Sequence, residues 1–382
     1  MSETLTPPQR MDWPSVPEII WNGQPYLYFC GTGYLGLQND PRVLQAASDA
    51  TQLGLHACTT RAGWGTTPYH TYVEDQLRDF TGFAEALYLP TGFGAVRAAL
   101  QMLKATSSLP DFQFILKSMH PAGREAARDL LPEYPIEIGL DLEDLDDLPD
   151  GATVLLMADG VLPISGKSPD FSRIPGLLNR GMKITLIVDD AHGFGVLGNG
   201  GRGTLDAHNL TSVISKNGSC PLKKHPSLRI YYCGTLSKAA GGYGGFVASS
   251  DGFDRSAVPL YTGTTPLPNP IAAATARALT ILTSEPEHLA NLRRNITCFS
   301  DGLRSIGLTP PPENIPVWSV SFSDMESAQA VWQSLAGQGI LCQIFPAYSD
   351  ATGPCIRVAL FASHTKTHIT RLIDALSKAP II

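Results

Sequence analysis

The stretch that decides the fold is Ile184-Thr185-Leu186-Ile187-Val188-Asp189-Asp190-Ala191-His192-Gly193. It begins with five mostly apolar residues and ends in two carboxylates, a histidine and a glycine. A short run of this kind is typical of a parallel strand that helices cover on both faces. A carboxylate at the end of a buried strand is costly unless a cation meets it. The stretch therefore predicts a buried strand with a polar site at its carboxyl end.

Similar short apolar runs recur on either side, and a small or polar turn and a helical pattern follow each one. These runs are Ala86–Leu89, Phe112–Leu116, Thr153–Met157 and Ile230–Cys233. Strands that alternate with helices favour a doubly wound α/β sheet. Ligands of such sheets bind at the carboxyl ends of the strands. The residues directly after each run are therefore the candidates for a site.

The pattern changes after the proline-rich stretch Pro266–Pro270. Residues 46–268 are expected to form a large domain, and residues 269–382 a small C-terminal α+β domain. Residues 1–45 form a turn-rich N-terminal segment. In the small domain we expect helices over Ile271–Ile306, Met325–Gly337 and His364–Lys378, and strands over Val317–Phe322 and Cys355–Leu360.

The composition favours a well-buried globular enzyme, since 43% of the 382 residues are hydrophobic and 16% are charged. The net charge of −7 offers no basic face for nucleic acid. Seven scattered cysteines without a C-x-x-C pair argue against a disulfide framework or a zinc site and favour a reducing compartment. The chain shows neither a secretory signal pattern nor a membrane-spanning apolar run, so a soluble, cytoplasmic protein is expected.

Two strand ends offer groups that suit a flat, phosphorylated cofactor. The turn Thr91-Gly92-Phe93-Gly94-Ala95 opens a helical pattern, where free backbone N–H groups and the positive end of the helix dipole suit a phosphate. An ordinary strand-to-helix turn is the alternative. His120 follows the next run and could stack on a ring, or it could be a purely structural histidine.

Two further strand ends offer a carboxylate and an amine. Asp189 could pair with a pyridinium nitrogen, or it could cap a helix. Lys238 lies in Gly234-Thr235-Leu236-Ser237-Lys238-Ala239-Ala240-Gly241-Gly242, where small neighbours would let a ring approach for Schiff-base formation. Thr235 or Ser237 could reach a phosphate, and a solvated lysine is the alternative. Together, the four strand ends supply the groups of one cofactor site.

The sequences Asp189-Asp190-Ala191-His192-Gly193 and Thr235-Leu236-Ser237-Lys238 resemble those of the α-oxoamine synthases, a family of fold-type I enzymes that depend on pyridoxal 5′-phosphate (PLP). The similarity extends from Gly33–Leu37 to Cys355–Val358. It implies a large domain with a mostly parallel seven-stranded sheet and a small C-terminal α+β domain. It also implies PLP as the cofactor.

The resemblance also implies a role for each matching residue. Lys238 would form the Schiff base with PLP and move the substrate α-proton. Asp189 would pair with the pyridine nitrogen, His192 would hydrogen-bond the ring hydroxyl, and His120 would stack on the ring. The remaining residues and their implied partners are Gly92, Phe93 and Thr235 for the phosphate, Thr264 for the phosphate of a neighbouring subunit, and Arg357 for the substrate carboxylate.

The implied reaction is a decarboxylative condensation of an amino acid with an acyl-CoA to give an α-aminoketone. Within the family, the resemblance favours the branch that makes 8-amino-7-oxononanoate for biotin synthesis. It implies a homodimer, because the active sites of the family lie at the subunit interface. The acyl-CoA partner follows from the resemblance alone, since no run of residues indicates it.

Several positions depart from the family pattern. Gly33 replaces an Asn or Asp, Thr60 lies in Cys58-Thr59-Thr60 where a Gly-Gly-Ser stretch is usual, and Pro163 replaces a small hydroxyl residue. The segment 204–234 is longer than usual and could cover the thioester entrance or only decorate the surface. These changes leave open an aminotransferase-like enzyme that does not use acyl-CoA.

Two alternatives come from other classes of protein. A non-catalytic subunit is disfavoured because Lys238, Asp189 and His192 are all present. A nucleotide-binding dehydrogenase would need G-x-G-x-x-G after its first strand, and Thr91–Arg97 does not complete that pattern.

Overall fold

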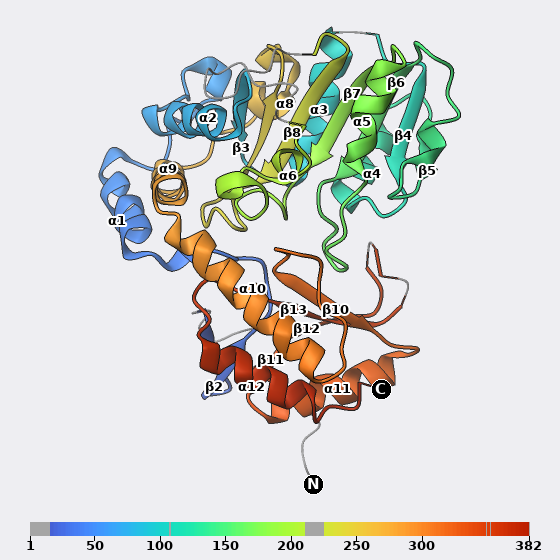
Figure 1. The fold of residues 1–382 in the computed structure, drawn as a ribbon. Coiled ribbons are helices and arrows are strands. Elements are labelled where there is room, and N and C mark those ends of the chain that lie inside the picture. The colour runs from blue at the N-terminus through green and yellow to red at the C-terminus, as the bar shows by residue number, and fades with distance from the viewer. Residues whose placement is uncertain (1–15, 107, 211–224, 349, 352, 382) are drawn as a thin grey trace. The chain divides into compact units, whose positions relative to one another are not determined.

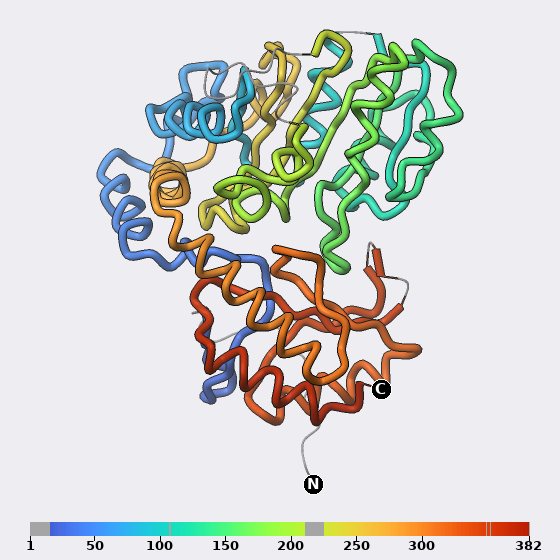
Figure 2. Tube along the Cα trace, in the orientation of Figure 1, coloured from blue at the N-terminus to red at the C-terminus, as the bar shows by residue number. Residues whose placement is uncertain are grey.

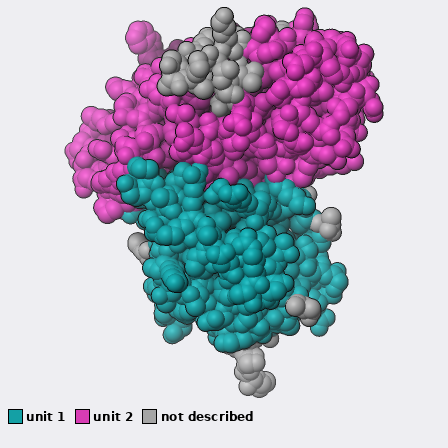
Figure 3. All heavy atoms as spheres, in the orientation of Figure 1, with its two compact units in different colours: residues 1–39, 163–167, 286–382 teal, residues 40–162, 168–285 magenta. Residues whose placement is uncertain are grey.

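The computed structural model describes residues 16–106, 108–210, 225–348, 350–351 and 353–381. The chain divides into two compact units, coloured separately in Figure 3. The larger unit comprises residues 40–162 and 168–285, and the smaller unit comprises residues 1–39, 163–167 and 286–382.

A seven-stranded sheet forms the centre of the larger unit and confirms the predicted fold class. Its strands, in spatial order, are β3 (Glu85–Leu89), β9 (Gly245–Ser249), β8 (Leu228–Thr235), β7 (Lys183–Asp189), β6 (Thr153–Asp159), β4 (Phe112–Leu116) and β5 (Ile136–Ile138). Strand β9 runs opposite to the other six strands of this sheet. All five predicted runs are strands of this sheet, while the residue pattern had not singled out β5 and β9.

Helices cover both faces of this sheet, which explains why its central strands are apolar throughout. Helix α3 (Phe93–Thr106) packs against β7, β8 and β9, and α4 (Pro121–Leu130) lies beside α3. Helix α5 (Ile174–Asn179) lies on the opposite face (Figure 1). This division follows from right-handed crossovers, because the connections through α3 and α5 advance across the sheet in opposite directions.

The packing of three helices, α1, α2 and α9, sets the boundary of the larger unit. Helix α9 (Asn269–Ser284) packs against α1 (Pro41–Ala50) and α2 (Pro68–Thr81). The larger unit therefore extends to residue 285, beyond the expected boundary at 268, and it includes α1, part of which was assigned to the N-terminal segment. Two short helices complete it, α6 (Thr204–Ala207) and α8 (Pro259–Thr262).

The described residues of the smaller unit form two three-stranded sheets and three α-helices. One sheet joins β1 (Glu18–Trp21) and β2 (Gln24–Tyr28) to β11 (Ile340–Leu341), and the other orders β10 (Val317–Ser321), β13 (Cys355–Ala359) and β12 (Gln343–Phe345). Its helices are α10 (Glu287–Ser305), α11 (Met325–Gly337) and α12 (Lys366–Leu376), which Figure 2 shows as part of the C-terminal half of the trace. The predicted helices and strands of this region are present, and the stretch Ile271–Ile306 forms two helices, α9 and α10.

Candidate functional site

The amine of Lys238 and the imidazole of His192 meet at the carboxyl ends of two central strands of the large sheet, β8 and β7. Their Nζ and Nε2 atoms lie 2.9 Å apart. Each residue follows the end of its strand by three positions, and the strands β7 and β8 are parallel neighbours in which Asp189 pairs with Cys233. Parallel neighbours end at the same edge of a sheet, so the two turns bring both side chains together.

Asp189 is the last residue of β7, and its carboxylate lies close to the same pair of turns. The residue is 9% exposed and accepts a hydrogen bond from the N–H of Ala191 at 3.2 Å. Burial raises the pKa of this carboxyl group, while the charges of Lys238 and His120 act to lower it. Asp189 does not cap a helix, because the chain after it forms turns as far as the 3₁₀ helix at Asn199–Gly201. The capping alternative is therefore wrong.

His120 is half-buried, and both its ring and its backbone are hydrogen-bonded. It is the N-cap of α4, where its Nδ1 accepts a hydrogen bond from the N–H of Ala122 at 3.2 Å. The backbone N–H of His120 donates to the carboxylate of Asp159, at the end of β6, at 2.8 Å. Burial lowers the pKa of the His120 ring, and the nearby charge of Asp189 partly opposes that shift. His120 thus has a structural function as a helix cap within electrostatic reach of Asp189 and Lys238.

The predicted phosphate turn packs tightly against the end of β8. A Cβ atom added at Gly92 would lie 2.6 Å from the Cβ of Thr235, and one added at Gly245 would lie 2.4 Å from the Cα of Gly92. The Thr235 hydroxyl lies 2.7 Å from that of Ser237. Helix α3 begins at Phe93, so its first N–H groups and its positive dipole end lie beside these hydroxyls.

A fully buried carboxylate that sequence reasoning did not assign holds the turn after β7. Asp190 accepts hydrogen bonds from the N–H and the hydroxyl of Thr204 at 2.7 and 2.5 Å, and from the hydroxyl of Tyr232 at 2.6 Å. Burial raises the pKa of Asp190 to about 6. A Cβ added at Gly193 would lie 2.2 Å from its Oδ1, which explains the glycine. The doubled aspartate was the available signal, but its partners are distant in sequence.

A second buried polar network, which the sequence analysis did not predict, surrounds Arg61 in the larger unit. Arg61 Nη1 donates to Glu74 at 2.6 Å and to the carbonyl of Tyr88 at 3.0 Å, and the Arg61 guanidinium carbon lies 5.4 Å from the ring centroid of Tyr261. Arg255 pairs with the other oxygen of Glu74 at 2.8 Å. The network ties α2 and β3 to the segment that continues into Thr264. Thr264 itself is half-buried and donates to the carbonyl of Leu260 at 2.8 Å.

Arg357 lies at the centre of β13 in the smaller unit and is 3% exposed. Its Nε donates to the carbonyl of Pro163 at 2.8 Å, Nη1 to the carbonyl of Gly31 at 3.0 Å, and Nη2 to the hydroxyl of Tyr34 at 3.1 Å. A guanidinium has five N–H donors, so these contacts leave one on each terminal nitrogen. Its role toward a substrate stays a prediction.

The positions that depart from the family pattern have local structural partners. A Cβ at Gly33 would lie 2.7 Å from the side-chain nitrogen of Gln38, so that side chain occupies the space. Thr60 is the N-cap of the 3₁₀ helix at Arg61–Gly63 and accepts from Gly63 at 3.2 Å. The Pro163 carbonyl accepts from Arg357, as described above. Of the longer segment 204–234, residues 211–224 lie outside the described residues.

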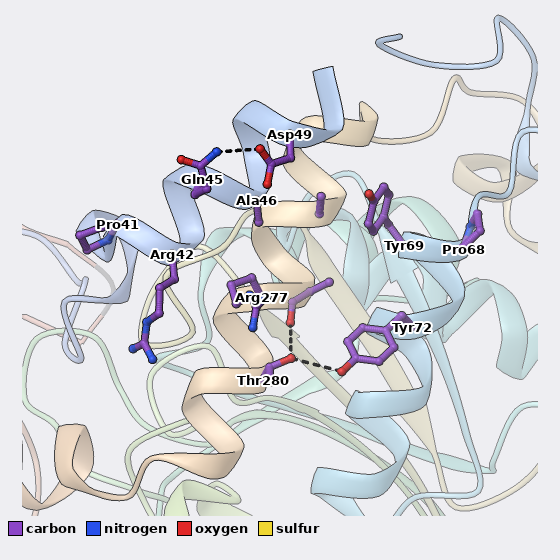
Figure 4. A pocket seen from close by; sticks show the side chains of 12 residues that line it. Pro41, Arg42, Gln45, Ala46, Asp49, Pro68, Tyr69, Tyr72, Arg277 and Thr280 are labelled. Atoms are coloured by element: carbon purple, nitrogen blue, oxygen red, sulfur yellow. Dashed lines mark hydrogen bonds between the residues drawn. The ribbon is translucent and has the colours of Figure 1, made fainter. Parts of the chain in front are cut away.

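A separate groove of about 890 Å³ lies between α1, α2 and α9 (Figure 4). Its walls include Arg42, Tyr69, Tyr72, Arg277 and Thr280. None of the residues predicted to form the cofactor site lines this groove.

Known proteins resemble this chain over almost its full length. The family model for aminotransferase class I and II matches residues 26–376. An 8-amino-7-oxononanoate synthase from Cellvibrio japonicus is 30% identical over 96% of this chain and 89% of its own length. The enzyme of that name from Pseudomonas entomophila is 31% identical over 96% of this chain and 91% of its own length.

Solved structures share the fold. A serine palmitoyltransferase variant from S. paucimobilis, with bound PLP and myriocin, has a TM-score of 0.82 at 24% identity and covers 96% of this chain and 91% of that chain. An 8-amino-7-oxononanoate synthase from Francisella tularensis has a TM-score of 0.71 at 22% identity, and the match covers 92% of this chain and 97% of that chain.

The chain belongs to the aminotransferase class I and II family. Its fold is that of the fold-type I PLP-dependent transferases, and the resemblance to the α-oxoamine synthases is confirmed. It is accordingly a PLP-dependent enzyme of the acyltransferase type.

Proposed function

We propose that this enzyme is an 8-amino-7-oxononanoate synthase of biotin synthesis. The observation that carries the proposal is the full-length similarity to curated enzymes of that name, at 30–31% identity. The product name fixes the substrates by carbon count: a seven-carbon dicarboxylic acyl thioester joined to alanine after alanine loses its carboxyl carbon. The amino acid is therefore alanine, and the acyl donor is a pimeloyl thioester such as pimeloyl-CoA.

The residues at the sheet edge fit PLP, because they combine an amine, a buried carboxylate and a helix N-terminus beside two hydroxyls. When bound, PLP supplies an electron-withdrawing ring that stabilises negative charge at the substrate α-carbon. Lys238 would hold the cofactor and move the proton at that carbon. Asp189 would keep a proton on the ring nitrogen, since a buried carboxylate is stabilised by a cation beside it. His192, 2.9 Å from Lys238, would donate to the ring hydroxyl.

Three further groups would position the cofactor. The N–H of Gly92, the N–H of Phe93 at the start of α3, which here donates to the Thr91 hydroxyl at 3.2 Å, and the hydroxyl of Thr235 would bind the phosphate. His120 would stack on the ring, supported by its fixed orientation as the N-cap of α4. These roles are supported by the packing of Gly92 on Thr235, which puts the helix start and the hydroxyl in contact.

Arg357 would bind the carboxylate of alanine through the two N–H groups that its protein contacts leave available. A planar guanidinium whose other donors are already fixed suits a bidentate carboxylate. The smaller unit would thus contribute the residue that recognises the amino acid.

The proposal includes a cytoplasmic homodimer in which Thr264 reaches the phosphate site of the second subunit. Several large apolar side chains of the larger unit support a covered surface, since Leu53, Leu55 and Trp64 are 65%, 63% and 94% exposed. Burying such residues in an interface is favourable. Among the described residues, none of the helices has the length and apolarity that spanning a bilayer requires.

The test is the release of free thiol from pimeloyl-CoA and acetyl-CoA, with alanine, glycine or serine supplied in turn. Thiol release with pimeloyl-CoA and alanine, absent in Lys238→Ala, is the expected result. Release with another pair would identify a different α-oxoamine synthase. A PLP-loaded protein that releases no thiol but converts amino acids would favour the aminotransferase-like alternative, and the changes at Gly33, Thr60 and Pro163 would be its explanation.

A further inference from the structure

The loop Pro163–Lys167 is part of the smaller unit, although in sequence it follows β6 of the larger one. Gly166 has a φ of +68°, and a Cβ added there would lie 2.5 Å from Cγ2 of Ile315. Only glycine adopts this conformation without strain, and no other residue would fit against Ile315. The loop is therefore closely packed against the smaller unit, where it can act on the side chains beside it.

This loop supplies one of the groups that orient Arg357. The carbonyl of Pro163 accepts the hydrogen bond from Nε, at 2.8 Å. Because Nε lies on one edge of the planar guanidinium, this contact fixes the rotation of the plane, while Gly31 and Tyr34 bind the terminal nitrogens. A displaced Pro163 carbonyl would leave the plane free to tilt.

Asp350 holds the loop at the two positions directly after Pro163. Its Oδ1 accepts the N–H of Ile164 at 3.2 Å, and its Oδ2 accepts the N–H of Ser165 at 2.7 Å. Asp350 lies in the connection between β12 and β13, and β13 carries Arg357. Burial raises the pKa of the Cys355 thiol at the start of β13. The charge of Asp350 raises this pKa further and Arg357 acts to lower it, so the charge of Asp350 reaches this strand.

We propose that Asp350 is a positioning residue for the amino-acid substrate. By accepting the N–H groups of Ile164 and Ser165, it keeps the Pro163 carbonyl on Nε of Arg357. The terminal nitrogens of Arg357 then keep the orientation that a substrate carboxylate needs. This inference rests on the proposed function of Arg357 and adds a residue that does not itself contact the substrate.

Asp350→Asn tests the proposal, because the amide keeps one acceptor and turns an NH₂ group toward a backbone N–H. We expect the Kd for alanine, from spectral titration of the PLP-loaded enzyme, and the KM for alanine to rise roughly tenfold, the effect of one disturbed charge-assisted hydrogen bond. The kcat and the PLP content should stay unchanged. Asp324→Asn is the matched control, since Asp324 also accepts a backbone N–H, from Ser327 at 2.8 Å, but caps α11.

A double-mutant cycle with Arg357→Lys separates positioning from general stability. If Asp350 acts through Arg357, Asp350→Asn adds little to the loss already caused by Arg357→Lys. Losses in alanine affinity that multiply would overturn the proposal, as would a wild-type Kd in Asp350→Asn. An Arg357→Lys enzyme with unchanged alanine affinity would instead refute the carboxylate role of Arg357, and the inference with it.

Discussion

Gly92→Ala is the sharpest test of the phosphate turn, because the structure gives the size of the perturbation. The added Cβ would lie 2.6 Å from Cβ and 3.2 Å from Cα of Thr235. Non-bonded carbon atoms settle at about 3.5–4.0 Å, so the turn must shift by about 1 Å. Thr235 has little freedom to withdraw, since it ends β8 and pairs with Gly245 of β9. Gly245 in turn packs against Gly92.

Overpacking of this kind costs about 1–3 kcal/mol. If PLP binding requires the original position of the turn, the Kd for PLP should rise roughly tenfold to a hundredfold, at about 1.4 kcal/mol for each factor of ten. The assay is absorbance titration of the apoenzyme with PLP. The control is Gly176→Ala in α5, where an added Cβ would have nothing within 4 Å. Equal PLP affinity in Gly92→Ala, Gly176→Ala and the wild type would refute the assignment of this turn.

Three further predictions concern the lysine and the two buried networks. Lys238→Ala should lose the visible absorbance of lysine-bound PLP, and an unchanged yellow spectrum would reject the assignment. The native pKa of Asp190, about 6, is above the reference value of 3.8, so its contribution to stability is complete below about pH 4 and is lost as the pH rises through 6. The wild type loses about 3 kcal/mol of stability in this way, whereas Asn does not titrate. The urea midpoint of Asp190→Asn should therefore rise relative to that of the wild type between pH 4 and pH 6. Parallel midpoints would contradict this account. Arg61→Met should destabilise the protein to urea by about 3 kcal/mol, because it leaves Glu74 buried with less compensation. Arg304→Met, in an exposed pair, should change little, and equal effects would show that burial is not the cause.

The sequence alone indicated five of the seven strands of the large sheet, because strands covered on both faces must be apolar throughout and are recognisable as short runs. It also indicated the residues that gather at one edge. Asp189 ends its strand, and His192 and Lys238 follow theirs by three positions; parallel strands place such positions together whatever the remaining chain does. The pattern did not reveal β5, which has only three residues, or β9, which follows a glycine-rich turn.

Tertiary structure decided the features that depend on contacts between distant parts of the chain. Asp190 and Thr204 meet only after the turn closes, and neither residue has a local pattern that names the other. Helix α9 belongs to the larger unit because of the surfaces that it covers, although the proline-rich stretch before it resembles a domain boundary. The loop at Pro163 leaves β6 and joins the smaller unit for the same reason. A sequence pattern records which residues must be buried, whereas the partner that buries them is fixed by packing in three dimensions.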